Sequence, residues 1–284
     1  MLWIMALPSW RRRWCTVAVA GCAVLCLTAP SAQAKAKHRH VAARPQAVKA
    51  KVFTGAGFDA CTAPALPAMT AWWGGSGYRA LGIYIGGADR ACADGNLSKP
   101  WVKAVGKIGW QLVPIYVGLQ APCARQPKLK LMDPKTVAAQ ANAAADDAAG
   151  RAAAFDLVRG STLYFDLESY PRKDPACTGV VLNFLSAWTK RLHTHGYFSG
   201  LYASAGSGIT DLAAAKTPGL VRPDALWIAR WDNAAKVQDP AVPDNAWTPH
   251  QRIKQFAGGH KEAHGRVTLN IDTDYLDGPV ARIG

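Results

Sequence analysis

Two carboxylate residues stand two positions apart in the segment LYFDLESY, residues 163–170. Asp166 follows a run of apolar and aromatic residues, and Glu168 comes shortly before Pro171, a pattern typical of a buried strand that ends near Glu168. Residues i and i+2 of a strand point to the same face, so both carboxylates are expected on one face. Mutual repulsion and partial burial should raise the pKa of one of them, which is how a general acid is made.

The elements that position this pair alternate between short β-rich runs and helical patterns. Helix starts are predicted where Ser98 precedes Pro100 and where Asp133 precedes Pro134. The clearest helices are predicted over 134–155 and 179–195, and the connections 232–250 and 257–268 are predicted to be irregular. Eight strands are predicted, over residues 52–58, 79–85, 111–117, 162–168, 197–203, 225–231, 251–256 and 269–274.

Eight strands alternating with helices over this length predict an α/β fold, a single (β/α)8 TIM-type barrel. A doubly wound open sheet is the alternative, but the strands lack the glycine-rich phosphate loop of its nucleotide-binding version. In a barrel, functional groups collect at the carboxyl ends of the strands. The polar residues at the predicted strand ends are Asp59, Tyr84, Tyr116, Gln120, Asp166, Glu168, Tyr202, Trp231, Asp232, Gln255, Asp272 and Asp274.

This set of residue types suits a carbohydrate. Aromatic faces stack on sugar rings, amides and phenols bond to hydroxyl groups, and clustered acids favour cleavage of a glycosidic bond. A purely structural role would need a cation beside each buried carboxylate. The only basic residues at the predicted strand ends are Arg230 and the more peripheral residues of the seventh strand. The alternative is a barrel mouth that binds a ligand without reacting. The residues predict no cofactor and no metal, since the His residues lack ligand spacing.

The beginning of the chain has the features of an export signal. Residues 11–13 are three arginines, residues 15–29 are apolar, and Ala32-Gln33-Ala34 resembles a cleavage site, so residues 1–34 are predicted to be a signal peptide. A transmembrane anchor is the rival interpretation, but the apolar run is short for one. Export predicts a secreted or cell-envelope location.

The formal net charge of +14 is concentrated at the front of the chain. Residues 1–51 hold nine basic and no acidic residues, which leaves 24 basic against 19 acidic residues in the rest. Residues 35–51 are therefore predicted to be a basic disordered tail, and 52–284 to be the barrel. The tail could contact anionic wall polymer or a membrane surface, or serve only as a solvated tether. Nucleic acid is not the expected partner of an exported chain.

Four cysteines remain after the predicted signal peptide, and an even number in an exported protein suggests two disulfides. They fall in the loops after the first four predicted strands. Because neighbouring loops pair most easily, the expected disulfides are Cys61–Cys92 and Cys123–Cys177.

Several motifs in combination carry a resemblance to a known family. They include GFDACTAP (57–64), YFDLESY (164–170), LWIARW (226–231) and IDTDYLDGP (271–279). Over essentially all of 52–284 the chain resembles the glycoside-hydrolase-like domain of exported actinobacterial proteins. That domain is similar to the family 25 muramidases, barrel lysozymes that cut peptidoglycan between N-acetylmuramic acid and N-acetylglucosamine.

The resemblance implies roles for four predicted catalytic residues. Glu168 would donate a proton to the leaving oxygen, and Asp166 would orient or stabilise, for example by holding a substrate acetamido group that acts as the internal nucleophile. Asp59 and Asp272 would position substrate or water. The muramidase motif of the last strand reads Asp-x-Asn, whereas Asp274 stands in the Asn place here. The predicted partner is a cell-envelope polysaccharide, bound by Tyr84, Tyr116, Gln120, Tyr202, Trp231, Gln255 and Asp274.

Overall fold

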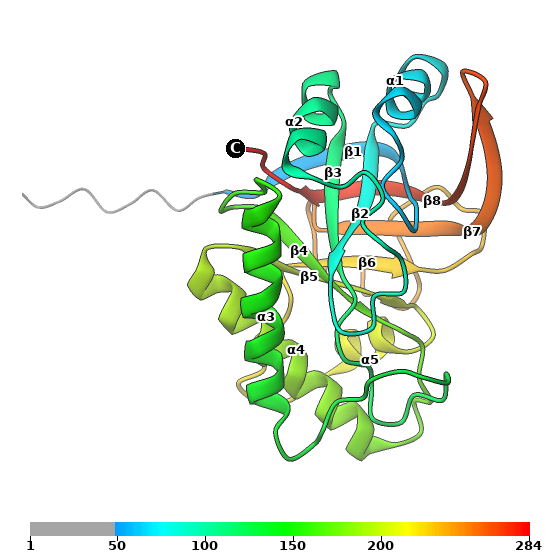
Figure 1. Ribbon diagram of the computed structural model, residues 1–284. Helices are drawn as coiled ribbons and strands as arrows, with labels where there is room; N and C mark the ends of the chain where they lie inside the picture. The colour runs from blue at the N-terminus through cyan, green and yellow to red at the C-terminus, as the bar shows by residue number, and fades with distance from the viewer. Residues whose placement is uncertain (1–48) are drawn as a thin grey trace, which may run out of the picture. The chain divides into compact units, whose positions relative to one another are not determined.

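Eight strands close into a barrel in the computed structural model, which describes residues 49–284 (Figure 1). The strands follow one another around the barrel in chain order, so the predicted α/β barrel is confirmed. The predicted signal peptide, 1–34, and nearly all of the predicted tail, 35–51, lie outside the described residues. The strands are β1 Lys51–Asp59, β2 Ala80–Gly86, β3 Gln111–Tyr116, β4 Thr162–Leu167, β5 Phe198–Ser204, β6 Ala225–Ala229, β7 Arg252–His264 and β8 Val267–Val280.

One helix follows each of the first five strands. The helices are α1 Leu66–Gly75, α2 Lys99–Ile108, α3 Val137–Ala154, α4 Pro175–His195 and α5 Gly208–Ala214. As predicted, the Ser98 side chain caps α2 by accepting a hydrogen bond from the backbone N–H of Trp101. Among the described helices, none is long and apolar enough to cross a membrane.

The helices α3 and α4 begin at other residues than predicted. The Asp133 carboxylate accepts from the Lys135 N–H and forms a turn ahead of α3, which starts only at Val137. The helix α4 starts earlier than residue 179, because the Asp174 carboxylate caps it by accepting two backbone N–H bonds. It ends before Gly196, whose left-handed φ of 79° allows the chain to turn.

The last strand runs in the opposite direction to the other seven. β8 pairs antiparallel with both β1 and β7, whereas all other neighbouring strands are parallel. Asp272 and Asp274 therefore lie within β8, and not at its carboxyl end as predicted. They still reach the mouth of the barrel, since Asp272 pairs in register with Asp59, the last residue of β1.

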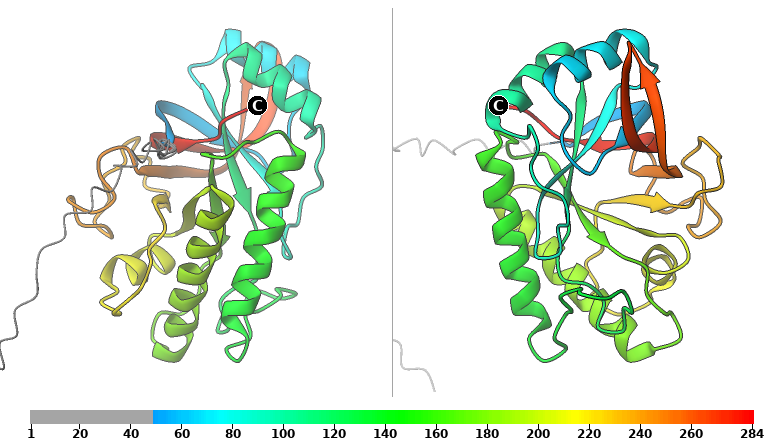
Figure 2. Two further views of the ribbon diagram at one scale, coloured as in Figure 1. Left: turned by 90° about the vertical axis from the view of Figure 1, so that its left-hand side faces the viewer. Right: turned by 45° about the vertical axis from the view of Figure 1, so that its right-hand side comes forward.

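The connection between β7 and β8 is a hairpin, so the predicted irregular segment 257–268 is wrong. Antiparallel neighbours need only a two-residue turn, and Gly265 and Arg266 supply it with φ of 53° and 64°. Figure 2 shows the hairpin standing beside α1, with which both strands are in contact. The connection between β6 and β7 contains no regular element, as predicted.

Alternate residues of the strands fill the barrel and leave polar groups at one end. The Trp227 and Tyr164 rings lie in this interior 5.7 Å apart, and the Tyr164 hydroxyl donates to the backbone oxygen of Pro279. A Cβ atom at Gly82 would lie 2.5 Å from the Asp59 Cβ and 2.8 Å from the Trp227 ring. Only glycine therefore leaves room there for Asp59 to point inward. Most of the remaining core lies between the strands and the helices.

Both predicted disulfides are confirmed. Cys61 is bonded to Cys92 and Cys123 to Cys177, with Cα atoms 5.6 Å and 5.9 Å apart. Cys61–Cys92 links the loops that follow β1 and β2, and Cys123–Cys177 links the loop that follows β3 to the first turn of α4.

Candidate active site

A layer of polar side chains lies above the apolar interior of the barrel. Asp59, Tyr84, Asp166 and Tyr202 come from the carboxyl-terminal parts of β1, β2, β4 and β5. β7 contributes Gln255, and β8 contributes Asp272 and Asp274 from its middle. Each of these residues is an even number of positions away from the inward-facing residues of its strand. Because alternate side chains of a strand point to the same face, seven predicted site residues come together inside the barrel.

Asp59 is buried and receives a hydrogen bond on each carboxylate oxygen. The Tyr84 hydroxyl donates to Oδ1 at 3.0 Å, and the Gln255 amide donates from Nε2 to Oδ2 at 2.8 Å. Burial and the neighbouring charge of Asp272 raise the pKa of Asp59 to about 7, against the opposing effect of these hydrogen bonds. Asp59 is thus held in one orientation by two strands.

Gln255 connects Asp59 to the aromatic residues of the mouth. Its Oε1 atom accepts hydrogen bonds from the Tyr202 hydroxyl at 3.0 Å and from the Trp231 indole N–H at 2.9 Å. Trp231 nevertheless remains 66% exposed, and its ring covers Gly258 of β7. The result is a fixed aromatic face that is open to solvent at the mouth.

Asp166 is 4% exposed, and its Oδ1 atom has no hydrogen-bond partner in the described structure. Burial and the charges of Glu168 and Asp59 raise its pKa well above the ordinary value. An unpartnered buried carboxyl oxygen is costly unless a ligand completes it. Asp166 is therefore placed to bond to a group that enters the barrel mouth.

Glu168 lies just beyond the end of β4 and is exposed. It borders a cavity of about 420 Å³ that is also lined by Tyr202, Arg230 and Trp231. Partial burial raises the pKa of Glu168 above its ordinary value. A proton is thus retained to higher pH on a carboxyl that is open to solvent.

Gln120 holds the backbone that carries this acidic pair. Its side chain is fully buried, donates from Nε2 to the backbone oxygen of Asp166 at 3.0 Å, and accepts the Glu168 N–H at 2.7 Å. Both ends of the amide are therefore occupied by the protein. Gln120 therefore holds the backbone of Asp166 and Glu168 in place and does not line the cavity.

Tyr116 lies apart from the other predicted site residues. In β3 the inward positions are Val113 and Ile115, so Tyr116 faces the helices and packs against Trp188. Its hydroxyl donates to the Asp147 carboxylate of α3 at 2.9 Å. Asp232 is also turned away, since it accepts a bond from the buried Lys254 ammonium.

Trp227 belongs to the site although the sequence did not single it out. Its indole N–H donates to Asp274 Oδ1 at 2.8 Å from the floor of the polar layer. The available signal was the alternation of β6, in which Trp227 shares a face with Ala225. Burial raises the pKa of Asp274 well above its ordinary value, and the charge of Asp59 adds to this effect.

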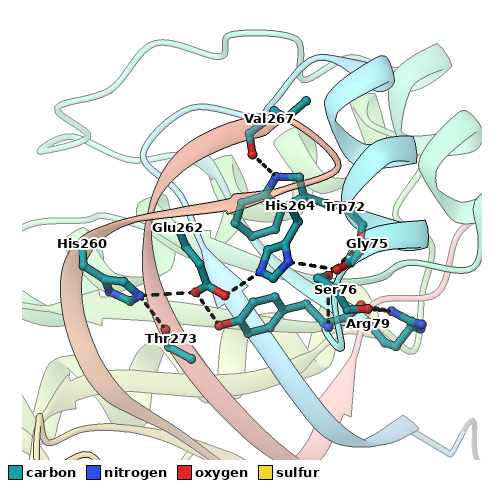
Figure 3. Close-up of polar contacts among 10 residues, drawn as sticks. Trp72, Gly75, Ser76, Arg79, His260, Glu262, His264, Val267 and Thr273 are labelled. Carbon is teal, nitrogen blue, oxygen red and sulfur yellow. Dashed lines mark hydrogen bonds and ion pairs between the residues drawn. The ribbon is translucent and has the colours of Figure 1, made fainter.

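A second polar cluster lies on the outer side of the β7–β8 hairpin and connects the hairpin to the end of α1 (Figure 3). Glu262 accepts from the Tyr78 hydroxyl at 2.8 Å and contacts His264 Nε2 at 2.6 Å and His260 Nε2 at 3.4 Å. His264 Nδ1 faces the backbone oxygen of Gly75, the last residue of α1, at 3.0 Å. Both His264 nitrogens are thus placed to donate to oxygen. Within residues 49–284, no group of three or more His, Cys, Asp or Glu is arranged to hold a metal ion.

Replacement of Glu262 by Gln is expected to lower the free energy of unfolding at pH 7 by about 1 kcal/mol. Burial raises the pKa of Glu262, but the bonds from His264, Tyr78 and His260 outweigh burial and lower it. This stabilisation is therefore present above the ordinary pKa of 4.5 and is lost as the pH falls through the lowered one. Urea unfolding at pH 7 and pH 3 checks this, with Lys261→Gln as the control. An equal difference at both pH values would contradict it.

Comparisons with known proteins agree with this architecture. Residues 70–276, well over half of the chain, match the model of the Rv2525c-like, glycoside hydrolase-like domain. No curated protein matches the chain significantly. Among solved structures, the Tat-secreted protein Rv2525c of Mycobacterium tuberculosis has a TM-score of 0.53 at 16% identity, covering 78% of this chain and 95% of that one.

Two further structures share the fold. An uncharacterized B. stearothermophilus protein has a TM-score of 0.52 at 17% identity, covering 78% of this chain and 95% of the other. The Clostridium perfringens spore cortex lytic enzyme SleM has a TM-score of 0.50 at 16% identity, covering 78% of this chain and 67% of that one. At these identities the similarity shows the barrel fold.

Proposed function

Because the chain belongs to the family of Rv2525c-like, glycoside hydrolase-like domains, we propose that it cleaves glycosidic bonds in a cell-envelope polysaccharide, with Glu168 as the general acid. The observation that carries this proposal is an accessible carboxyl with a raised pKa beside an open cavity, two residues from a buried carboxyl that lacks a partner. Peptidoglycan is the first candidate substrate. It is supported by the shared fold of a spore cortex lytic enzyme.

Glu168 and Asp166 have different roles in the proposed reaction. Glu168 gives its proton to the glycosidic oxygen as the bond to the anomeric carbon breaks. Asp166 orients a substrate acetamido group, whose oxygen attacks the anomeric carbon and forms a cyclic intermediate. Water then opens that ring, and the Glu168 carboxylate takes the proton that water releases. Asp59 and Asp272 position the substrate or this water.

The two disulfides fit a location outside the cytoplasm. Two disulfides persist in an oxidising compartment, and residues 1–34 carry the features of a signal peptide. We propose that the basic segment 35–51 then holds the barrel near anionic polymers of the envelope.

The alternative is a barrel that binds envelope glycan and does not cleave it, which the extensive hydrogen bonding of Asp59 favours. The two functions are separated by incubating the mature protein with purified peptidoglycan and with other envelope polysaccharides. Release of reducing ends from one of them would establish hydrolysis and identify the substrate class. Co-sedimentation with the insoluble glycan and no release would leave the binding function.

Replacement of Trp231 by Ala is expected to weaken glycan binding by about 0.5–1.5 kcal/mol, since it removes an exposed aromatic face held by Gln255. The measurement is the dissociation constant for a soluble fragment of the glycan, with Val158→Ala as the control. Val158 is exposed in the connection between α3 and β4, at the amino-terminal end of the strands and away from the mouth. Equal affinity of the two variants for the glycan fragment would show that Trp231 is not part of the binding site.

A further inference from the structure

A fully buried lysine lies on the outer face of β7, one residue before Gln255. Neighbouring residues of a strand point to opposite faces, so Lys254 faces outward where Gln255 faces into the barrel. The Lys254 ammonium bonds to the Asp232 carboxylate at 2.7 Å and lies 3.8 Å from the Asp239 carboxylate. Both carboxylates belong to the irregular connection between β6 and β7. Lys254 thus fastens this connection to the outside of the barrel.

Arg230 gives the same connection a second ionic contact. Its Nε and Nη2 atoms donate to the two oxygens of Asp239 at 2.7 Å and 3.0 Å. The Asp239 side chain is fully buried and also accepts the backbone N–H of Ala241 at 2.9 Å. The four charged residues Arg230, Asp239, Lys254 and Asp232 alternate in sign from one contact to the next, and together they are called the ion cluster here.

Trp231 stands in the sequence between the two ends of the ion cluster. Arg230 and Asp232 bond within the cluster, whereas the Trp231 indole turns to the mouth. The backbone of this segment stays paired with β7, since the Arg230 N–H donates to the Gln255 oxygen at 3.0 Å. A ring that is 66% exposed has few packing contacts to fix its direction. The direction of the Trp231 ring therefore depends on how its two neighbours are held.

The two faces of the barrel wall carry matching contacts at this point. Inside, Gln255 accepts from Trp231, and outside, Lys254 donates to Asp232. Two neighbouring residues of β7 thus hold two neighbouring residues that follow β6. Taking an ammonium out of water is costly, and apolar residues of similar size often replace a buried ion pair without loss of stability. Stability alone therefore does not account for a buried lysine at this position.

We propose that Lys254 is a positioning residue that acts through Asp232 to fix the direction of the Trp231 ring at the barrel mouth. The ring is then presented to a sugar without having to be ordered when the glycan binds. The binding of glycan by Trp231 rests on the proposed function, whereas the orientation of the ring does not.

The first test is a double-mutant cycle on glycan binding. Lys254→Met is expected to raise the dissociation constant for a soluble glycan fragment about 2- to 10-fold, within the loss caused by Trp231→Ala. In the Trp231→Ala background the same replacement should change nothing further, because the ring that it positions is gone. The control is Lys236→Met, at an exposed lysine of the same connection. Equal weakening by Lys254→Met in both backgrounds would overturn the proposal.

The variant is expected to fold. Asp232 is 37% exposed and Asp239 keeps its bonds to Arg230, so Lys254→Met leaves no carboxylate buried without a cation. Asp232→Ala provides a second variant, which removes the same contact from the solvent side. Urea unfolding of each variant separates a loss of binding from a loss of folded protein.

The second test needs no glycan. The Trp231 indole N–H, identified as the NMR signal missing in Trp231→Ala, should exchange with solvent several-fold faster in Lys254→Met and in Asp232→Ala than in the wild type. Lys236→Met should leave the exchange rate unchanged. A wild-type protein that binds no glycan would end the proposed function, and the exchange rate would then decide the positioning role. Unchanged exchange in both variants would overturn the proposal.

Discussion

Replacement of Glu168 by Gln is expected to lower kcat for glycan hydrolysis by about 10²–10⁴-fold, the usual contribution of a general acid. The amide keeps the size of the side chain but has no proton to give to the leaving oxygen. Binding of the glycan should be nearly unchanged, because the Trp231 ring is held by Gln255 and does not depend on Glu168. The measurement is the initial rate of reducing-end release, together with the dissociation constant for the same glycan.

The pH profile adds a second outcome for Glu168. A general acid must be protonated, so kcat should fall as the pH rises through the pKa of Glu168, which partial burial raises. The matched control is Asp244→Asn, an exposed residue in the connection between β6 and β7. Full activity of Glu168→Gln, or an unchanged alkaline decline in its residual activity, would remove Glu168 as the proton donor.

Removal of the Cys123–Cys177 disulfide, by replacing both residues with Ala, is expected to lower the free energy of unfolding by about 4 kcal/mol. The bond joins residues 54 positions apart, so its loss frees a long loop in the unfolded chain. Cys177 is also buried in the first turn of α4. Urea unfolding of the oxidised wild type and of the variant gives the difference.

A reducing agent provides the control for this prediction. It should destabilise the wild type through both disulfides and the variant only through Cys61–Cys92. A variant with the unfolding midpoint of the oxidised wild type would show that the bond adds no stability. The loop before α4 contains Tyr170, whose hydroxyl bonds to Asp211 of α5, so local order there should persist without the disulfide.

The order of the strands was predictable because each buried strand has its own apolar pattern and turn signals. The direction of β8 was not, since an alternating pattern reads the same in either direction. The hairpin segment AGGHKEAH, 257–264, lacks a regular apolar alternation because it lies beyond the barrel and buries little. It therefore reads as a loop, although backbone pairing makes it a strand.

The candidate site was predictable where chemistry and strand position coincide. Asp59, Asp166 and Gln255 all lie at inward positions near the mouth, as expected. Tyr116 was not predictable in this way. It stands one residue away from an inward-facing position of β3, and a shift of one residue along a strand turns the side chain to the other face of the sheet. Gln120 shows another, since its partners are backbone groups of β4 that only the folded chain brings near.

The hairpin places one acid of the mouth on a strand that is held differently from the strands of the others. Asp59 and Asp166 belong to strands held on both sides within the closed barrel, whereas Asp272 stands at the last β1–β8 pair, where β8 leaves β1. The β7–β8 pairing is irregular between Ala257 and His260, next to this point. Asp272 is thus the acid of the layer that lies nearest to the hairpin, whose two strands are in contact with α1. The position of this one carboxylate therefore depends on packing outside the barrel, whereas Asp59 and Asp166 are placed by the barrel itself.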